Sequence, residues 1–226
     1  MKYNNIYKGI FIERPNRFIA KVLINGKTET VHVKNTGRCK EILTPGVPCY
    51  LEKSQNPNRK TPYDLIAAEK GDRLINIDSQ VVNKVFLEFL QMGGLFKDIT
   101  LIKPETTFGK SRFDFYIERG RRKAFIEVKG VTLERENIVS FPDAPTERGT
   151  KHIKELIEAY KAGYETYIIF VVQTEKVKYF IPNYETDSVF GQSLKEAKQK
   201  GVKILAYDCS VTPDEIKILN KIKIKL

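Results

Sequence analysis

Turn-forming dipeptides divide the first 80 residues into short segments, and this spacing limits the folds open to the chain. Asn25-Gly26 and Pro45-Gly46 are two of these dipeptides, which supply a positive φ or fix φ. The segments between the turns have β-type composition and cover residues 7–13, 18–24, 29–33, 48–53, 64–70 and 73–77. Strands this short and closely spaced predict a small barrel, and the oligonucleotide-binding (OB) type has the size that fits.

The hydrophobic period changes to that of a helix after Asp78. Apolar residues recur at positions 82, 85, 86 and 89, Ser79 is placed to cap the helix, and Gly93-Gly94 ends the pattern. The later patterns predict, in order, a β-hairpin (111–118 and 123–130), a polar loop (132–150), a helix ending at Gly163, a strand (166–173), a helix (188–200) and a strand (202–207). The alternating tail KIKIKL is typical of a lysine-guarded edge strand.

This order of elements predicts two domains. Residues 1–80 are expected to form an OB-like nucleic-acid-binding barrel. Residues 81–226 are expected to form an α/β domain, in which helices flank a mixed sheet.

Composition narrows the class of protein. The chain is 41% hydrophobic and 11% aromatic, which suffices for a buried core and excludes a disordered or collagen-like protein. The longest apolar run, residues 167–172, is far shorter than the ~20 residues of a membrane helix. The first residues lack the apolar stretch of a signal peptide, so we expect a soluble, cytoplasmic protein. Cys39, Cys49 and Cys209 have neither CxxC nor metal-ligand spacing, and we interpret them as packing residues.

The net charge of +11 makes polyanions the first partners to consider, although such an excess also serves solubility alone. Basic residues fall at or near the predicted turns of the barrel: Arg14, Arg17, Lys34, Arg38, Arg59 and Lys60. Phe11, Phe18 and Tyr63 lie close to them in the sequence. Barrels of this type use basic and aromatic residues to track a phosphate backbone and to stack bases, so we expect them to bind nucleic acid. The alternative is that these residues are solvated loop charges.

The predicted hairpin carries the strongest chemical signal. Successive side chains of a strand alternate between its faces, so Phe113, Phe115 and Ile117 are expected to share an apolar face, with Arg112 and Asp114 on the other. On the second strand, Glu127 and Lys129 are expected to lie on the same face as Asp114. This convergence requires a register in which residue 118 pairs with residue 123.

An Asp, a gap of about a dozen residues and then Glu-x-Lys on the next strand is the PD-(D/E)xK arrangement of restriction-enzyme-like nucleases. Two carboxylates repel each other, and a hard divalent cation such as Mg²⁺ or Mn²⁺ relieves that repulsion. We therefore predict a metal site with Asp114 and Glu127 as ligands and Lys129 beside the scissile phosphate. A relic site that binds without cutting and a plain structural strand are the alternatives.

Further residues are candidates by position. Glu88, on the border of the apolar stripe of the first helix, is predicted as a third acidic ligand, the alternative being an ordinary surface residue. Gln173 ends a buried strand and is predicted to support the ligands without touching the metal. Four basic residues are expected to bind nucleic acid, three of them where a loop becomes a helix: Arg112, Arg148, Lys151 and His152.

Eight blocks of sequence match one family in the same order: RPNRF (14–18), NTGR (35–38), NPNRKTPYDL (56–65), SRFDF (111–115), EVKGVTL (127–133), FPDAPTERGTKHIKEL (141–156), FVVQ (170–173) and AYDC (206–209). In these blocks the chain resembles the sugar fermentation stimulation protein A family of bacteria and archaea. The resemblance implies an OB-type barrel, a PD-(D/E)xK nuclease-like domain, and a protein that binds DNA and influences sugar utilisation. It carries over the motif positions Asp114, Glu127, Lys129 and Glu88. The family name describes a phenotype and leaves the biochemical activity open.

Two functions follow from these observations. The first is a Mg²⁺-dependent nuclease that binds single- or double-stranded DNA with its barrel and cuts it at the hairpin. The second is a non-catalytic DNA-binding regulator that keeps the nuclease fold as a scaffold. RNA processing is a third reading, because such barrels accept either nucleic acid. The sequence does not indicate an oligomeric state.

Overall fold

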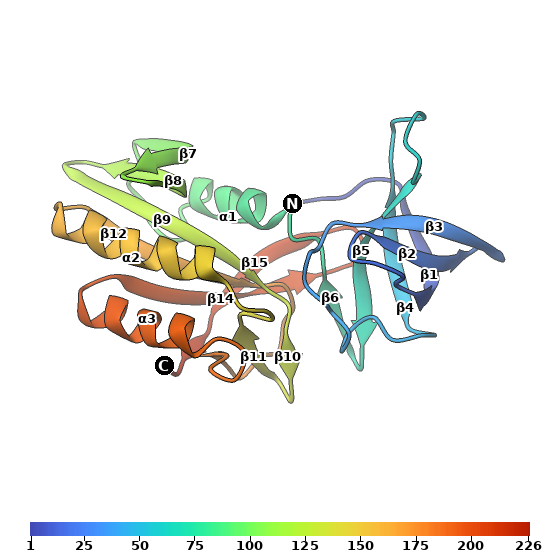
Figure 1. The fold of residues 1–226 in the computed structure, drawn as a ribbon. Helices are drawn as coiled ribbons and strands as arrows, with labels where there is room; N and C mark the ends of the chain where they lie inside the picture. Colours follow the sequence, from blue (N-terminus) through green and yellow to red (C-terminus); the bar gives the residue numbers. More distant parts are fainter.

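The computed structural model describes residues 1–226 and places a barrel beside an α/β domain (Figure 1). The barrel domain has the strands β1 (Ile6–Glu13), β2 (Ile19–Ile24), β3 (Lys27–Val33), β4 (Pro48–Lys53), β5 (Tyr63–Lys70) and β6 (Arg73–Asn76). Its order is β3-β2-β1-β4-β5-β6, and parallel pairing of β3 with β5 closes the barrel. The predicted hairpin is confirmed, because Asn25 and Gly26 both have positive φ between β2 and β3.

The second domain contains α1 (Val82–Gln91), β7 (Leu101–Phe108), β8 (Ser111–Arg119), β9 (Arg122–Val131), β10 (Glu134–Arg135), β11 (Ile138–Phe141), α2 (Glu147–Lys161), β12 (Glu165–Val172), β13 (Tyr179–Pro182), α3 (Ser188–Gln199), β14 (Lys203–Val211), β15 (Ile216–Lys221) and β16 (Lys223–Ile224). Its main sheet has the order β15-β14-β12-β9-β8-β7. Strands β9, β12 and β14 are parallel, and the others pair antiparallel. The sheet is therefore mixed, as predicted.

Helices cover both faces of this sheet. The core on one face includes Val85 and Phe86 of α1, and the core on the other includes Ile153 of α2 and Leu194 of α3. Figure 1 shows α2 and α3 side by side. Strand β12 contributes to both cores, which explains its nearly continuous run of apolar residues.

Several elements depart from the sequence-based expectations. Strand β7 was not predicted; it contains Pro104, and it lies at the sheet edge, where a missing N–H is tolerated. The segment expected to be one polar loop contains β10 and β11, which join β13 and β16 in a small second sheet. Strand β16 is the predicted edge strand of the tail. Ser79 does not cap α1: its hydroxyl donates to the carbonyl of Lys34, 2.7 Å away.

The three cysteines are buried free thiols, as expected of packing residues. The longest helix, α2, has 15 residues, and none of the helices has both the length and the apolar character to cross a bilayer.

A buried hydrogen-bond network joins the two domains. The Asn76 backbone N–H, at the end of β6, donates to the carbonyl of Gln173 (2.9 Å). The Gln173 amide then donates to Asn76 Oδ1 (2.8 Å) and to the Asp78 carbonyl (3.0 Å). Asp78 is fully buried and pairs with Lys34 of the barrel at 2.8 Å. Because buried polar groups need partners, this network holds the linker in one position.

Candidate active site

The β8–β9 hairpin has the register that the convergence of acidic residues required. Glu118 pairs with Lys123, and Phe115 pairs with Ile126, the last pair of the ladder. Beyond that pair, a side chain and not the backbone of β8 bonds to β9: Asp114 Oδ2 accepts the backbone N–H of Val128 at 2.7 Å. The carboxylate of Asp114 is thereby fixed against β9.

The predicted division of β8 into faces is wrong at Phe113. Its ring lies 5.4 Å from that of Phe125 and belongs to the core under α2, whereas Phe115 packs 5.6 Å from Phe86 of α1. The change of face coincides with the end of the β8–β9 ladder at Phe115. Strict alternation of side chains holds only while a strand keeps its regular pairing.

Asp114, Glu127 and Lys129 line one pocket of about 440 Å³, together with residues of the linker, α1, β7 and α2. The other lining residues are Ser79, Gln80, Val82, Asn83, Glu105, Arg112, Val128, Gly130, Arg148 and His152. Only two of the lining residues are hydrophobic, so the pocket suits a charged, hydrated ligand.

Burial and the nearby charge of Glu127 raise the pKa of Asp114. The N–H of Val128 and the side-chain amide of Asn83, which donates to Oδ1 at 2.8 Å, offset part of this rise. The raised pKa shows that the negative charge on Asp114 is disfavoured in this pocket, and a bound cation would remove that penalty.

Glu127 is 2% exposed, and Lys129 and His152 both contact the same one of its carboxylate oxygens. Oε1 accepts the Lys129 ammonium at 2.5 Å and also contacts Nδ1 of His152. Burial acts to raise the pKa of Glu127, but the hydrogen bond with His152 and the charge of Lys129 outweigh it and hold the pKa below its usual value. Glu127 is therefore ionised, while its buried Oε2 has no hydrogen-bond partner.

These residues fit a hard divalent cation. An ionised carboxylate with an unpartnered buried oxygen stands beside a second carboxylate whose charge is disfavoured. No three His, Cys, Asp or Glu side chains come together as a complete ligand set. A cation here would have to add water or substrate oxygens to two carboxylates, which is how Mg²⁺ commonly binds.

Glu88, predicted as a third ligand, does not reach this pocket. Its Oε2 pairs with the amino group of Met1 at 2.5 Å, and it lines a separate hollow with Phe89 and Lys217. Asn83 faces Asp114 instead. At ~100° per residue, Glu88 lies about 140° around the helix from Asn83, so the two cannot face the same site.

Helix α2 supplies two of its three predicted residues to the pocket. Arg148 is exposed, and its side chain has no hydrogen-bond or ion-pair partner. His152 is buried against Glu127. Lys151 points elsewhere and donates to the carbonyl of Lys110. On β8, Arg112 pairs with Glu105 at 3.0 Å at the rim of the pocket.

Sequence reasoning missed Asn83, which binds Asp114 directly. Asn83 interrupts the apolar pattern of α1 between Val82 and Val85, and this was the available signal. Gln173 is 1% exposed and does not line the pocket. It supports the site from behind, because its side chain lies against Gly130, where an added Cβ would be only 2.8 Å from Oε1.

Three of the six basic residues predicted on the barrel are occupied by partners within the protein. Arg14 donates to four backbone carbonyls, Arg59 forms two hydrogen bonds with Asp64, and Lys34 pairs with Asp64 and Asp78. These three side chains were expected to bind nucleic acid, but their contacts are with groups of the protein itself. The side chains of Arg17, Arg38 and Lys60 are exposed and make no such contacts.

The aromatic residues near these basic groups also differ in exposure. Phe11 is 2% exposed in the barrel core, and Tyr63 packs against Tyr7 with ring centroids 5.3 Å apart. Phe18 is 55% exposed. Of the three aromatics expected near nucleic acid, only Phe18 is this open.

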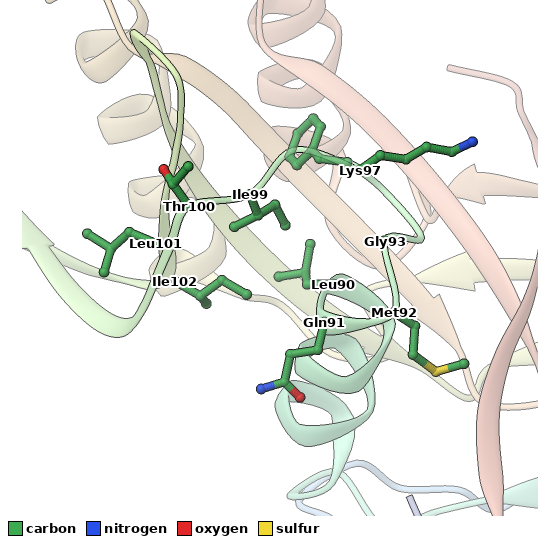
Figure 2. Close-up of a pocket in the computed structure, with 10 residues that line it drawn as sticks. Leu90, Gln91, Met92, Gly93, Lys97, Ile99, Thr100, Leu101 and Ile102 are labelled. Carbon is green, nitrogen blue, oxygen red and sulfur yellow. The ribbon is translucent and has the colours of Figure 1, made fainter.

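A larger pocket of about 650 Å³ lies between the end of α1 and the start of β7. Figure 2 shows its apolar lining, which includes Leu90, Met92, Ile99 and Ile102. Lys97 is the one charged residue of the lining, and there is no carboxylate. Its lining has no carboxylate, histidine or cysteine to hold a metal ion, so it is not the candidate site.

The fold defines the class of protein: a closed OB barrel joined to a mixed-sheet α/β domain of the restriction-endonuclease type. Residues 12–77 match the family model "SfsA N-terminal OB domain", and residues 80–215 match "Sugar fermentation stimulation protein RE domain". The chain belongs to the sugar fermentation stimulation protein family.

Relatives match over their whole length. The sugar fermentation stimulation protein homolog of Clostridium beijerinckii is 58% identical over 226 residues, 100% of both chains. The homolog of Desulfitobacterium hafniense is 57% identical, over 100% of this chain and 99% of its own. The solved structure of Pyrococcus furiosus SfsA in complex with Ca²⁺ is 30% identical, with a TM-score of 0.90 over 100% of this chain and 98% of that chain.

Proposed function

We propose that the protein is a divalent-metal-dependent phosphodiesterase that cuts nucleic acid, with DNA as its first candidate substrate. The observation that carries this proposal is the pair of carboxylates, buried Glu127 and half-buried Asp114, beside Lys129 in a pocket rimmed by arginines. A purely structural role gains nothing from like charges held together in a buried place, whereas a metal site requires them.

In this proposal Asp114 and Glu127 hold the cation. Mg²⁺ or Mn²⁺, when bound, polarises the phosphate and makes the attacking water more acidic. The Pyrococcus furiosus relative was solved in complex with Ca²⁺, a hard cation that takes oxygen ligands as Mg²⁺ does.

The other residues of the pocket position the reactants. Lys129 is paired with Glu127 in the absence of a cation. When Glu127 binds the cation instead, the Lys129 ammonium can hold a phosphate oxygen or orient the water. Arg148, whose side chain is exposed and unpaired, is placed to hold the phosphate at the rim. His152 fixes the orientation of Glu127 through Nδ1.

A second candidate function is that of a DNA-binding regulator without catalysis. The name of the family supports it, because stimulation of sugar fermentation describes an effect on the cell and not a reaction. An experiment can distinguish the two functions, because only the nuclease cleaves nucleic acid.

The test is incubation of the pure protein with labelled single-stranded DNA, duplex DNA or RNA, with Mg²⁺, Mn²⁺ or a chelator. We expect fragments only with metal, and loss of cleavage in Lys129→Ala. Asp98→Asn, which alters an exposed acid outside the pocket, is the control and should cut like the wild type. Tight binding of nucleic acid with no fragments from any substrate would reject the nuclease and support the DNA-binding regulator.

A further inference from the structure

Arg14 ties two loops of the barrel together. Its guanidinium donates to the carbonyl of Arg17 in the β1–β2 loop (2.6 Å). It also donates to the carbonyls of Asn35 (2.6 Å), Gly37 (2.8 Å) and Arg38 (2.7 Å) in the loop after β3. One arginine thus holds residues 14–18 against residues 34–38.

This arrangement brings the backbone of Arg38 close to that of Arg17 and its neighbour Phe18, because the carbonyls of Arg17 and Arg38 both accept from the same guanidinium; we call Arg17, Phe18 and Arg38 the cluster. Both arginines are exposed, and neither side chain has a hydrogen-bond or ion-pair partner. Phe18 is the most exposed aromatic residue of the chain, at 55%. Its backbone is fixed, because its N–H donates to Asn16 Oδ1 and its carbonyl accepts the N–H of Val33. A single exposed Phe needs no explanation, but here an exposed aromatic ring and two exposed, unpaired arginines come from two loops that Arg14 holds together.

The same loop contacts the linker at the carboxylate pocket and the second domain close to it. The Lys34 carbonyl accepts both the N–H (3.1 Å) and the hydroxyl (2.7 Å) of Ser79, a residue that lines the pocket. At its other end, the N–H of Arg38 donates to Asp143 Oδ2 at 3.2 Å. Asp143 lies in the segment that leads into α2, where Arg148 also lines the pocket. Loop 34–38 therefore connects the Arg17–Phe18–Arg38 cluster with Ser79 of the pocket lining and with the segment that leads to Arg148.

We propose that Arg17, Phe18 and Arg38 form, with the carboxylate pocket, one continuous surface for a single-stranded nucleic acid segment. A base stacks on Phe18, the two arginines contact the flanking phosphates, and the strand continues past Arg148 into the pocket. The bases of a duplex are already stacked on each other, so they cannot use the face of Phe18. This inference rests on the proposed function in taking the pocket as a phosphate site.

The test is fluorescence anisotropy with a labelled oligo-dT single strand and a duplex of matched length. The protein carries Asp114→Asn throughout, so that no cleavage intervenes. Adding Phe18→Ala should weaken single-strand binding roughly tenfold, as expected for one stacked base, and should change duplex binding less than twofold. Phe18→Trp should restore single-strand binding, because it restores an aromatic face.

Matched controls separate the cluster from general surface effects. Leu219→Ala alters another exposed apolar side chain, and Arg121→Ala with Arg135→Ala removes two exposed arginines outside the cluster. These variants should bind like the parent, whereas Arg17→Ala with Arg38→Ala should lose roughly tenfold on the single strand, as expected for two lost phosphate contacts.

The outcomes distinguish this inference from the proposed function. If Phe18→Ala binds the single strand like the parent while Arg148→Ala still weakens binding, the pocket takes nucleic acid and the cluster does not, and the inference is overturned. If Phe18→Ala weakens single strand and duplex equally, stacking is not its role, and the inference is also overturned. If the parent binds neither nucleic acid, the proposed function itself has failed.

Discussion

Asp114 carries a disfavoured charge in the absence of a cation, and this has a measurable consequence for stability. Its folded pKa is raised by burial and by Glu127, so ionisation at neutral pH destabilises the folded state. Asp114→Asn removes the charge; its amide oxygen can still accept the Val128 N–H, and the Asn83 amide can turn to present its oxygen. In chelator at pH 7, we expect the variant to melt roughly 2–4 °C above the wild type in differential scanning calorimetry.

Divalent cations should reverse that order. With the cation site proposed above, Ca²⁺ or Mg²⁺ should bind only the folded wild type, raise its melting temperature and leave that of Asp114→Asn unchanged. Equal stabilisation of both proteins by the metal would place the cation site away from Asp114.

Asp64, a buried residue of β5 in the barrel, illustrates the opposite electrostatic situation. Burial acts to raise its pKa, but the hydrogen bonds with Arg59 and the charge of Lys34 outweigh it, so its pKa lies below the usual value. A folded pKa below the unfolded one contributes stability above the unfolded pKa of ~3.9, and this stability is lost as pH falls through the folded value.

The prediction for Asp64 follows from that sign. Asp64→Asn should lower the melting temperature at pH 7, and the difference from the wild type should shrink as pH falls below about 4. Thermal melts between pH 7 and pH 3 measure it. A difference that stays constant over this range would mean that the variant acts through packing and not through charge.

At the scale of elements, the position of β9 depends on the close approach of α1 and β12 behind it. A Cβ added at Gly130 would lie 2.8 Å from Val82 Cγ2 of α1 and 2.8 Å from Gln173 Oε1. Gly130→Ala should therefore push β9 toward the pocket, destabilise the protein by about 1–3 kcal/mol and reduce cleavage through displacement of Lys129. Urea unfolding and initial cleavage rates give the two readouts.

A double-mutant cycle checks the cause. Val82→Ala removes one of the two clashing groups, so the double variant Gly130→Ala with Val82→Ala should be more stable than the sum of the single effects predicts. Strict additivity would show that the glycine is needed for a different reason.

At the scale of the whole molecule, the net charge of +11 is unevenly available to a polyanion. Arg14, Lys34 and Arg59 are held by acceptors within the barrel, whereas Arg17, Arg38 and Lys60 are not. Replacing the second set by Ala should therefore reduce the slope of log K against log[salt] by roughly 2 on single strands, at about 0.7 per phosphate contact.

The tail offers a matched comparison for that experiment. Lys221, Lys223 and Lys225 carry the same total charge at the carboxyl end of the chain. Their replacement by Ala should leave the slope unchanged. If both triple variants flatten it equally, binding follows net charge alone and the barrel is not a specific binding face.

The sequence by itself determined the features that depend on local pattern. Turn dipeptides and short β segments predicted the barrel, because a turn type is decided by the residues within it. The register of the β8–β9 hairpin also followed, because its short turn and the alternation of apolar residues permit few pairings. The convergence of Asp114, Glu127 and Lys129 on one pocket followed for the same reason.

Only the tertiary structure decided which candidate side chains are free to act. Arg14 and Glu88 looked available in the sequence, but their partners are backbone carbonyls up to 24 residues away and the amino group of Met1. Likewise, Asn83 and His152 reach Asp114 and Glu127 from separate helices. Such contacts join residues distant in the chain, so no local period encodes them, and they form only when the helices pack onto the two faces of the sheet.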